Sequence, residues 1–81
     1  MTKPAPDRTL DCVGRYCPEP IFLTREEIDK LEVGDVLEII ADDPASEEDI
    51  PRWAKRAGHE FLGMHKEGSE IYFLVRKGEG R

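Results

Sequence analysis

The hydrophobic residues change their spacing several times along the chain, and each change marks an expected element. Residues 9–13 alternate apolar and polar side chains up to Gly14, which predicts a short first strand. Residues 36–41 are almost continuously apolar, as in a strand that lies inside a sheet. Two further strand-like runs, 59–66 and 70–76, are separated by a short Gly-containing connection. This spacing predicts a closing hairpin.

Between these strands the apolar positions recur at helical spacing. The first predicted helix begins near Pro18, and the second ends near Ala57 with Gly58 as its stop. Pro51 complicates the second helix, because a proline at this point either bends the helix or marks its true start. The positions that define the two faces are Ile21, Leu23, Thr24, Ile28 and Leu31 in the first helix, and Ile50, Trp53, Ala54 and Ala57 in the second.

The element order βαβαββ predicts an α+β fold, a two-layer α/β sandwich with two helices packed on one face of a four-stranded mixed sheet. Two successive β-α units favour a parallel central pair of strands with right-handed crossovers, and the hairpin adds antiparallel pairing. With 81 residues the chain forms one domain. We expect this domain over residues 9–77, with a flexible segment at 1–8 and a flexible tail at 78–81.

Charge and composition narrow the function classes. The net charge is −6, and basic residues are interleaved with acidic ones, so direct tight nucleic-acid binding is disfavoured. Residues 1–8 lack the apolar core of a signal peptide, and no apolar run approaches membrane-spanning length. We therefore expect a cytoplasmic protein without a membrane partner. Thiols stay reduced there, so the two cysteines are more typical of chemistry than of a structural disulfide.

Cys17-Pro18-Glu19-Pro20 is the main candidate for chemistry. A proline in the first helical turn loses no intrahelical bond, so a helix that starts at Pro18 has Cys17 at its N-cap. Cysteine is a poor cap compared with Ser, Asp or Asn, which favours a chemical role. A helix terminus contributes about 0.3–1 kcal/mol, less than one pKa unit, and Glu19 opposes it. We expect a modestly activated thiolate nucleophile that needs no cofactor.

Cys12 has two interpretations, as a small buried residue or as a second thiol that meets Cys17 across the turn. The Cys-x-x-Cys spacing of dithiol redox proteins is absent. A zinc site from both cysteines with His59 and His65 is disfavoured, because four residues separate the cysteines and the histidines follow a strand pattern. We expect no metal.

Asp42-Asp43-Pro44 follows the best predicted strand. Paired carboxylates sometimes perform acid–base catalysis, but no electrophile or second base accompanies these two. A solvated turn that leads into the second helix is the favoured interpretation.

Several short motifs together resemble the TusA/SirA-like family in order and spacing from Thr9 to Lys77. The residues that carry the resemblance are Leu10-Asp11, Gly14, Cys17-Pro18-Glu19-Pro20, Gly34, Leu37-Glu38, Asp42-Asp43-Pro44, Asp49-Ile50-Pro51, Gly58-His59 and Phe73-Leu74-Val75-Arg76-Lys77. The resemblance implies the same two-layer fold. It also implies a sulfurtransferase-type carrier, rather than a stand-alone enzyme, that accepts sulfane sulfur as a persulfide on Cys17.

The family's roles include 2-thiouridine formation in tRNA, sulfur supply to cofactor synthesis and sulfur oxidation. The implied partners are a sulfur-donor protein, which is a cysteine desulfurase, a rhodanese or a DsrE-like protein, and a sulfur-acceptor protein.

Two residues depart from the family pattern. Arg15 stands where the family usually has Leu, and Tyr16 adds an aromatic ring beside the thiol. Arg15 is a candidate to stabilise a Cys17 thiolate or persulfide anion by Coulomb attraction. A regulatory or protein-interaction module whose Cys17 is redox-responsive without sulfur transfer is the main alternative. A ubiquitin-like carrier is disfavoured, because residues 78–81 lack a terminal diglycine.

Overall fold

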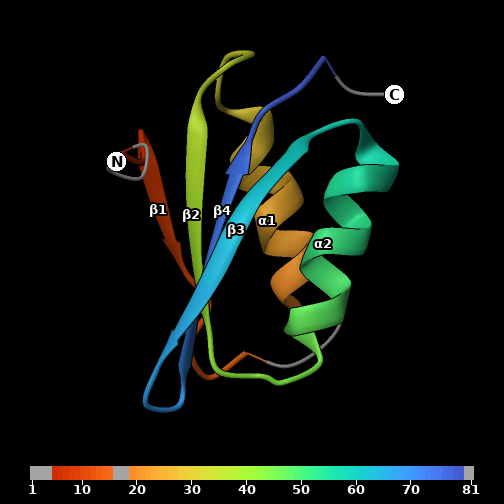
Figure 1. Cartoon of the computed structure of the whole chain (residues 1–81). Coiled ribbons are helices and arrows are strands. Elements are labelled where there is room, and N and C mark those ends of the chain that lie inside the picture. Colours follow the sequence, from red (N-terminus) through yellow and green to blue (C-terminus); the bar gives the residue numbers. More distant parts are fainter. Residues whose placement is uncertain (1–4, 16–18, 80–81) are drawn as a thin grey trace.

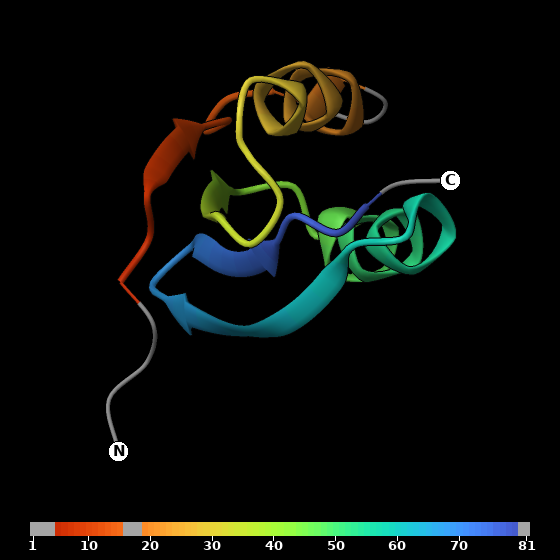
Figure 2. The ribbon, with the colours of Figure 1, turned by 90° about the horizontal axis from the view of Figure 1, so that it is seen from above.

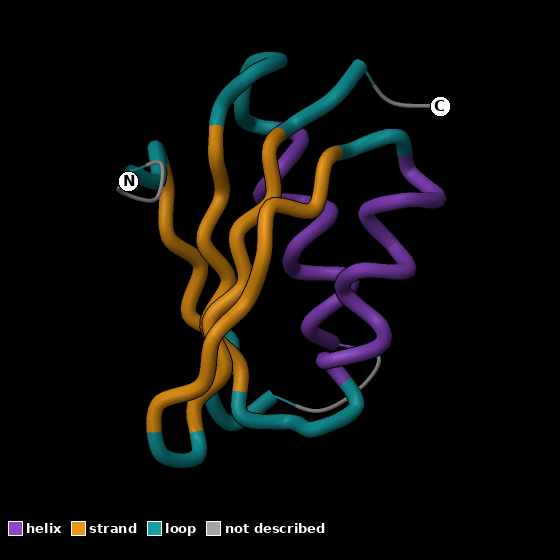
Figure 3. The backbone as a smooth tube through the Cα atoms, viewed as in Figure 1, coloured by secondary structure: helices purple, strands orange, loops and turns teal. Residues whose placement is uncertain are grey.

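The computed structural model describes residues 5–15 and 19–79, and the side chains of residues 19 and 20 are outside this description. The elements are β1 (Arg8–Asp11), α1 (Glu19–Asp29), β2 (Val36–Ala41), α2 (Ser46–Ala57), β3 (Glu60–Glu67) and β4 (Glu70–Arg76). The sheet forms one layer and both helices form the other (Figures 1 and 3). The predicted order βαβαββ and the two-layer α+β sandwich are therefore confirmed.

The four strands are arranged in the order β1-β2-β4-β3. β1 is parallel to β2, whereas β4 pairs antiparallel with both β2 and β3. The parallel pair therefore lies at one edge of the sheet. The sequence pattern predicts this pair at the centre, and that prediction is wrong. The reason is the apolar content of β4, in which Phe73, Leu74 and Val75 are successive buried residues. A strand that is buried on both faces is favoured at an interior position of the sheet.

The hydrophobic core lies between the sheet and the two helices (Figure 2). In the register of the central pair, Leu37 is opposite Val75 and Ile39 is opposite Phe73, so these side chains lie on the same face of the sheet. All four are fully buried. The helices contribute Thr24 and Ile28 from α1 and Ile50 and Ala54 from α2, and Trp53 packs against the cluster from its rim. The two helical faces that the sequence predicts are therefore the buried ones.

The second helix is continuous from Ser46 to Ala57, with Pro51 inside it. Its end is formed by Gly58, which has φ 83° in the left-handed region that glycine adopts most readily. The N–H of His59 donates to the carbonyl of Ala54 at 2.8 Å. Because this bond includes His59 in the helix cap, β3 begins at Glu60, one residue later than the predicted run 59–66.

None of the helices in the described part of the chain is long and apolar enough to cross a membrane.

Candidate functional site

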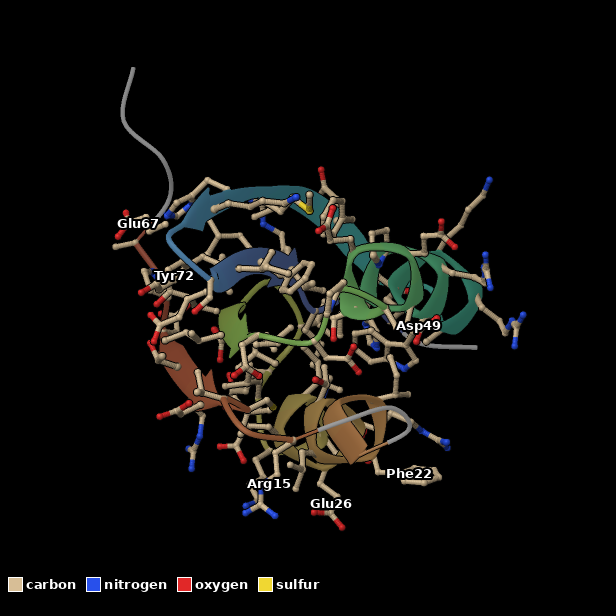
Figure 4. The ribbon with its side chains drawn as sticks, turned by 90° about the horizontal axis from the view of Figure 1, so that it is seen from below. Arg15, Phe22, Glu26, Asp49, Glu67 and Tyr72 are labelled. Carbon is tan, nitrogen blue, oxygen red and sulfur yellow. The ribbon has the colours of Figure 1, made fainter. Side chains whose placement is uncertain are left out.

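The candidate site lies at the end of the molecule where β1 ends and α1 begins (Figures 1 and 4). Tyr16, Cys17 and Pro18 lie outside the described residues, so the predicted N-cap position of Cys17 stays a prediction. Arg15 precedes these three residues, and Glu19, the first residue of α1, follows them. Pro20 is the second residue of this helix, where a missing N–H costs little. The site is therefore best understood from the two segments that lead into it and out of it.

The segment before the site leaves the sheet in a tight turn. The N–H of Cys12 donates to the carbonyl of Ile40 at 2.7 Å, and the N–H of Arg15 donates to the carbonyl of Cys12 at 3.0 Å. The first bond continues the parallel pairing of β1 with β2 by one residue. The second closes a turn of four residues. β1 therefore ends at Asp11, two residues before the end of the predicted run 9–13.

Two carboxylates hold the middle of this turn. The N–H of Val13 donates to Oδ1 of Asp11 at 2.9 Å, and the N–H of Gly14 donates to Oδ1 of Asp42 at 3.0 Å. Gly14 has φ 85°, a conformation that strains residues with a side chain. Asp11 and Asp42 come from the carboxyl ends of neighbouring parallel strands, which is why both reach the same turn. Every backbone N–H from residue 12 to residue 15 thus has a partner.

Asp42 therefore differs from its neighbour Asp43. The Asp43 side chain accepts the N–H of Ala45 at 3.1 Å, and its carbonyl accepts the N–H of Ser46 at 2.9 Å. Asp43 thus shapes the turn that leads into α2, as the sequence predicts for this motif. Asp42 does not, because its carboxylate contacts the segment before Cys17 instead. The sequence gives no local signal of this contact, because Gly14 and Asp42 are 28 positions apart.

Cys12 is fully buried and belongs to the hydrophobic core cluster. Burial and the Asp11 carboxylate raise the pKa of its thiol from 9.0 to about 11, against an opposite and smaller effect of the Arg15 charge. The thiol is therefore protonated near neutral pH and behaves as a small apolar side chain. A pairing of Cys12 with Cys17 stays a prediction, since Cys17 is outside the described residues.

The outer side of α1 carries exposed side chains of mixed character next to the site. In Figure 4, the side chains of Arg15, Glu26 and Phe22 extend outward on this side of the molecule. Phe22 is 54% exposed and Val13 is 39% exposed, although both are apolar. Aromatic side chains are enriched in protein-contact surfaces, so the exposed Phe22 is a candidate contact residue. The predicted effect of Arg15 on Cys17 stays a prediction.

The two histidines occupy different environments. Nδ1 of His59 accepts the N–H of Gly78 at 2.9 Å, whereas the His65 ring stacks on Tyr72 with a centroid distance of 4.8 Å. Within the ranges 5–15 and 19–79, no three His, Cys, Asp or Glu residues form a group that could hold a metal ion. The histidine environments therefore offer no support for the zinc alternative.

A cavity of about 330 Å³ lies at the opposite end of the molecule, between the carboxyl ends of the two helices. Two basic and two acidic side chains line it, together with Trp53 and His59. The charged side chains are Arg25, Lys77, Asp29 and Glu79. Because the opposite charges are equal in number, the cavity indicates no particular ligand. It is not continuous with the turn that precedes Cys17.

Comparisons with known proteins agree with the sequence motifs. The chain matches the family model described as "Sulfurtransferase TusA" over residues 8–77. It is 44% identical over 70 residues to an Archaeoglobus fulgidus protein named "Putative sulfur carrier protein", a match that covers 85% of this chain and 91% of that protein. The crystal structure of a SirA-like protein from Desulfitobacterium hafniense has a TM-score of 0.70 and 25% identity. That match covers 89% of this chain and 99% of the other.

Proposed function

We propose a function from one premise: the chain belongs to the TusA sulfurtransferase family, a family of sulfur carriers. In the proposal, Cys17 accepts sulfane sulfur as a persulfide and passes it to a second protein. The observation that carries this assignment is the burial of Cys12. Of the two cysteines in the chain, Cys12 is fully enclosed in the core with a raised thiol pKa. Cys17 is therefore the thiol left for exchange chemistry.

The chemistry is thiol–persulfide exchange. The Cys17 thiolate attacks the outer sulfur of a persulfide on the donor protein, so that a new S–S bond forms on Cys17. The S–S bond within the donor breaks, and the donor cysteine leaves as a thiolate. In the second transfer, a nucleophile of the acceptor attacks the outer sulfur on Cys17 and the Cys17 thiolate leaves. The first exchange conserves the number of S–S bonds, so it needs no oxidant, reductant or cofactor.

The surroundings of the site support transfer between proteins. The exposed Phe22 and Val13 provide apolar contact area on either side of the Cys17 segment in sequence. We propose a cysteine desulfurase, a rhodanese or a DsrE-like protein as the donor, and a second sulfur-binding protein as the acceptor. The proposed setting is the cytoplasm, where the Cys17 thiol stays reduced. The proposed pathway is tRNA thiolation, cofactor synthesis or sulfur oxidation.

A regulatory module is the second candidate function. In that case Cys17 responds to oxidants without transferring sulfur, and the partner recognises the oxidised or reduced form. Exposed thiols are readily oxidised when they have thiolate character, so the same residue would serve both functions. The two candidates differ in the product that forms on Cys17, which makes them separable by mass.

The test is sulfur loading of the reduced protein. Wild type, Cys17→Ser and Cys12→Ala are incubated with cysteine desulfurase and cysteine, and in parallel with rhodanese and thiosulfate. Intact-mass spectrometry then follows the gain of one sulfur atom. We expect the gain in wild type and Cys12→Ala, its loss after a reductant, and no gain in Cys17→Ser. Wild type that gains no sulfur from either donor, yet is oxidised at Cys17 by peroxide, would establish the regulatory function instead.

A further inference from the structure

The exchange chemistry proposed above assigns no role to Asp42, yet its side chain accepts a hydrogen bond from the turn that precedes Cys17. Its Oδ1 atom accepts the N–H of Gly14 at 3.0 Å. We propose that Asp42 is a positioning residue for Cys17, since its carboxylate holds the Gly14 amide at the end of β2 and so directs the chain toward the site. The inference rests on the proposed function for the identity of Cys17 as the reacting thiol.

The tether joins the turn to a rigid part of the molecule. Asp42 directly follows Ala41, the fully buried last residue of β2, and β2 is paired on both sides by β1 and β4. The Val13 amide, by contrast, is held by Asp11 of the same strand. The Asp42 side chain thus connects the turn to the end of a second strand. Its loss would remove this link, whereas the bond from the Cys12 N–H to the carbonyl of Ile40 would remain.

Gly14 is the residue at which such a tether has most effect. It lacks a Cβ and has φ 85°, so its backbone has more conformations available than any neighbour in the turn. A hydrogen bond from its N–H selects one of them. Cys17 follows Gly14 by three positions, which corresponds to at most about 11 Å of chain. The next described residue is Glu19 of α1, and α1 is fixed in the core through Thr24 and Ile28. The segment with Cys17 therefore connects two anchored points.

The charge and the tether of Asp42 have opposite consequences for a nearby thiolate. A negative carboxylate disfavours the thiolate, whereas a well-placed turn helps to hold it at the start of α1. Substitutions separate the two effects. Asn keeps an acceptor oxygen at the same place without the charge, and Ala removes both. A difference between Asp42→Asn and Asp42→Ala therefore reports the tether alone.

Asp35 provides a matched control. Its Oδ2 atom accepts the N–H of Glu32 at 3.1 Å, so it also holds a turn amide with a carboxylate. This turn lies between α1 and β2, at the other end of the sheet from the turn of residues 12–15 (Figure 1). Asp35→Ala should disturb its own turn as Asp42→Ala does, but far from the site.

The experiment measures two properties of Cys17 in wild type, Asp42→Asn, Asp42→Ala and Asp35→Ala. The first is the rate of alkylation by iodoacetamide as a function of pH, followed on the Cys17 peptide by mass spectrometry. The second is the rate of sulfur loading from cysteine desulfurase and cysteine. We expect the Cys17 pKa in Asp42→Ala to exceed that in Asp42→Asn by about 0.2–0.7 unit, the size of a helix-terminus effect. Sulfur loading should fall roughly tenfold in Asp42→Ala.

Asp42→Asn should load sulfur within about twofold of wild type, and Asp35→Ala should match wild type in both measurements. Equal pH profiles and loading rates for Asp42→Asn and Asp42→Ala would overturn the inference, as would an Asp35→Ala variant that reproduces the Asp42→Ala defect. If Asp42→Ala does not fold, Asp42→Glu replaces it, because its longer side chain keeps the charge and displaces the acceptor. If wild type takes up no sulfur, the proposed function fails, and the alkylation profiles still decide the role of Asp42.

Discussion

Nδ1 of His59 accepts a hydrogen bond from the backbone N–H of Gly78 at 2.9 Å. The bond requires an unprotonated Nδ1, so the ring is neutral with its proton on Nε2. Burial and the nearby Lys77 charge lower the pKa of His59 from its ordinary 6.5, and Asp29 partly opposes this shift. The fold therefore favours the neutral ring and uses it to hold the chain just after β4.

The first prediction concerns the effect of pH on stability. Because the folded pKa of His59 is below the unfolded value, the unfolded chain binds more protons once the pH falls below about 6.5. The free energy of unfolding should therefore decrease as the pH falls from about 6.5 toward the folded pKa. The measurement is urea unfolding between pH 7.5 and pH 5.

His59→Asn is the control for this prediction. The Asn Oδ1 atom can accept the Gly78 N–H but does not titrate in this range, so the decrease should be smaller in the variant. His65 is present in both proteins, so the comparison isolates the residue at position 59. Parallel pH dependences for wild type and His59→Asn would contradict the assignment to His59.

Gly78→Ala should disturb the same hydrogen bond by a steric route. A Cβ built on Gly78 would lie 1.9 Å from the carbonyl oxygen of Gly58, whose backbone is fixed as the cap of α2. Residue 78 must therefore move, and its bond to His59 is lost. We expect a loss of about 1–2 kcal/mol in the free energy of unfolding and a weaker dependence on pH between 7.5 and 5.

Gly68→Ala separates this effect from ordinary glycine strain. Gly68 has φ 61°, and a Cβ there would meet nothing within 4 Å. Alanine should cost about 1–2 kcal/mol through backbone strain alone, with the pH dependence of wild type retained. Wild-type stability in Gly78→Ala, or a pH dependence altered equally in both variants, would rule out the proposed clash.

Much of the fold was predictable because each element has a local signal. β2 and β4 have the bounds that their apolar runs predict, and Gly58 ends α2 as its type suggests. The order of the strands had no such local signal. β4 has nearly as continuous an apolar run as β2, and this property accounts for its interior position once the whole sheet is considered.

The sequence predicted the reactive residue of the site but not the hydrogen bonds that hold the turn before it. Cysteine before a proline-rich helix start identifies Cys17 from neighbouring residues alone. The bond between Gly14 and Asp42 joins positions that are distant in sequence, and it depends on β1 and β2 ending side by side. Similarly, nothing local distinguishes Asp42 from Asp43, because the two carboxylates differ only in where the fold places them.

Pro51→Ala should stabilise the protein. Pro51 is the sixth residue of α2 and has no N–H to donate to the carbonyl of Glu47. Proline in a helix interior costs about 3 kcal/mol relative to alanine, and its restriction of the unfolded chain returns about 0.4–1 kcal/mol. Pro51 is partly buried, so some packing is also lost. We expect the free energy of unfolding, measured by thermal unfolding, to increase by about 1–2 kcal/mol.

Lys55→Ala, an exposed substitution one turn later in α2, is the comparison for Pro51→Ala and should change stability by less than about 0.5 kcal/mol. Destabilisation by Pro51→Ala would mean that the proline ring contributes more through packing than the missing hydrogen bond costs. The alkylation rate of Cys17 should be unchanged in both variants, because neither residue is in the turn before the site.

The two thiols should differ sharply in reactivity. With a pKa of about 11 for Cys12, the thiolate fraction at pH 8 is about one in a thousand, and the fully buried sulfur is also shielded from reagents. Native wild type should therefore be alkylated promptly at Cys17 only. Wild type unfolded in urea should be alkylated at both cysteines. Native Cys12→Ala should react as fast as wild type, whereas native Cys17→Ser should be nearly inert. Prompt alkylation of Cys12 in native Cys17→Ser would show that the core opens at the end of β1, and a second thiol would then be available to the persulfide.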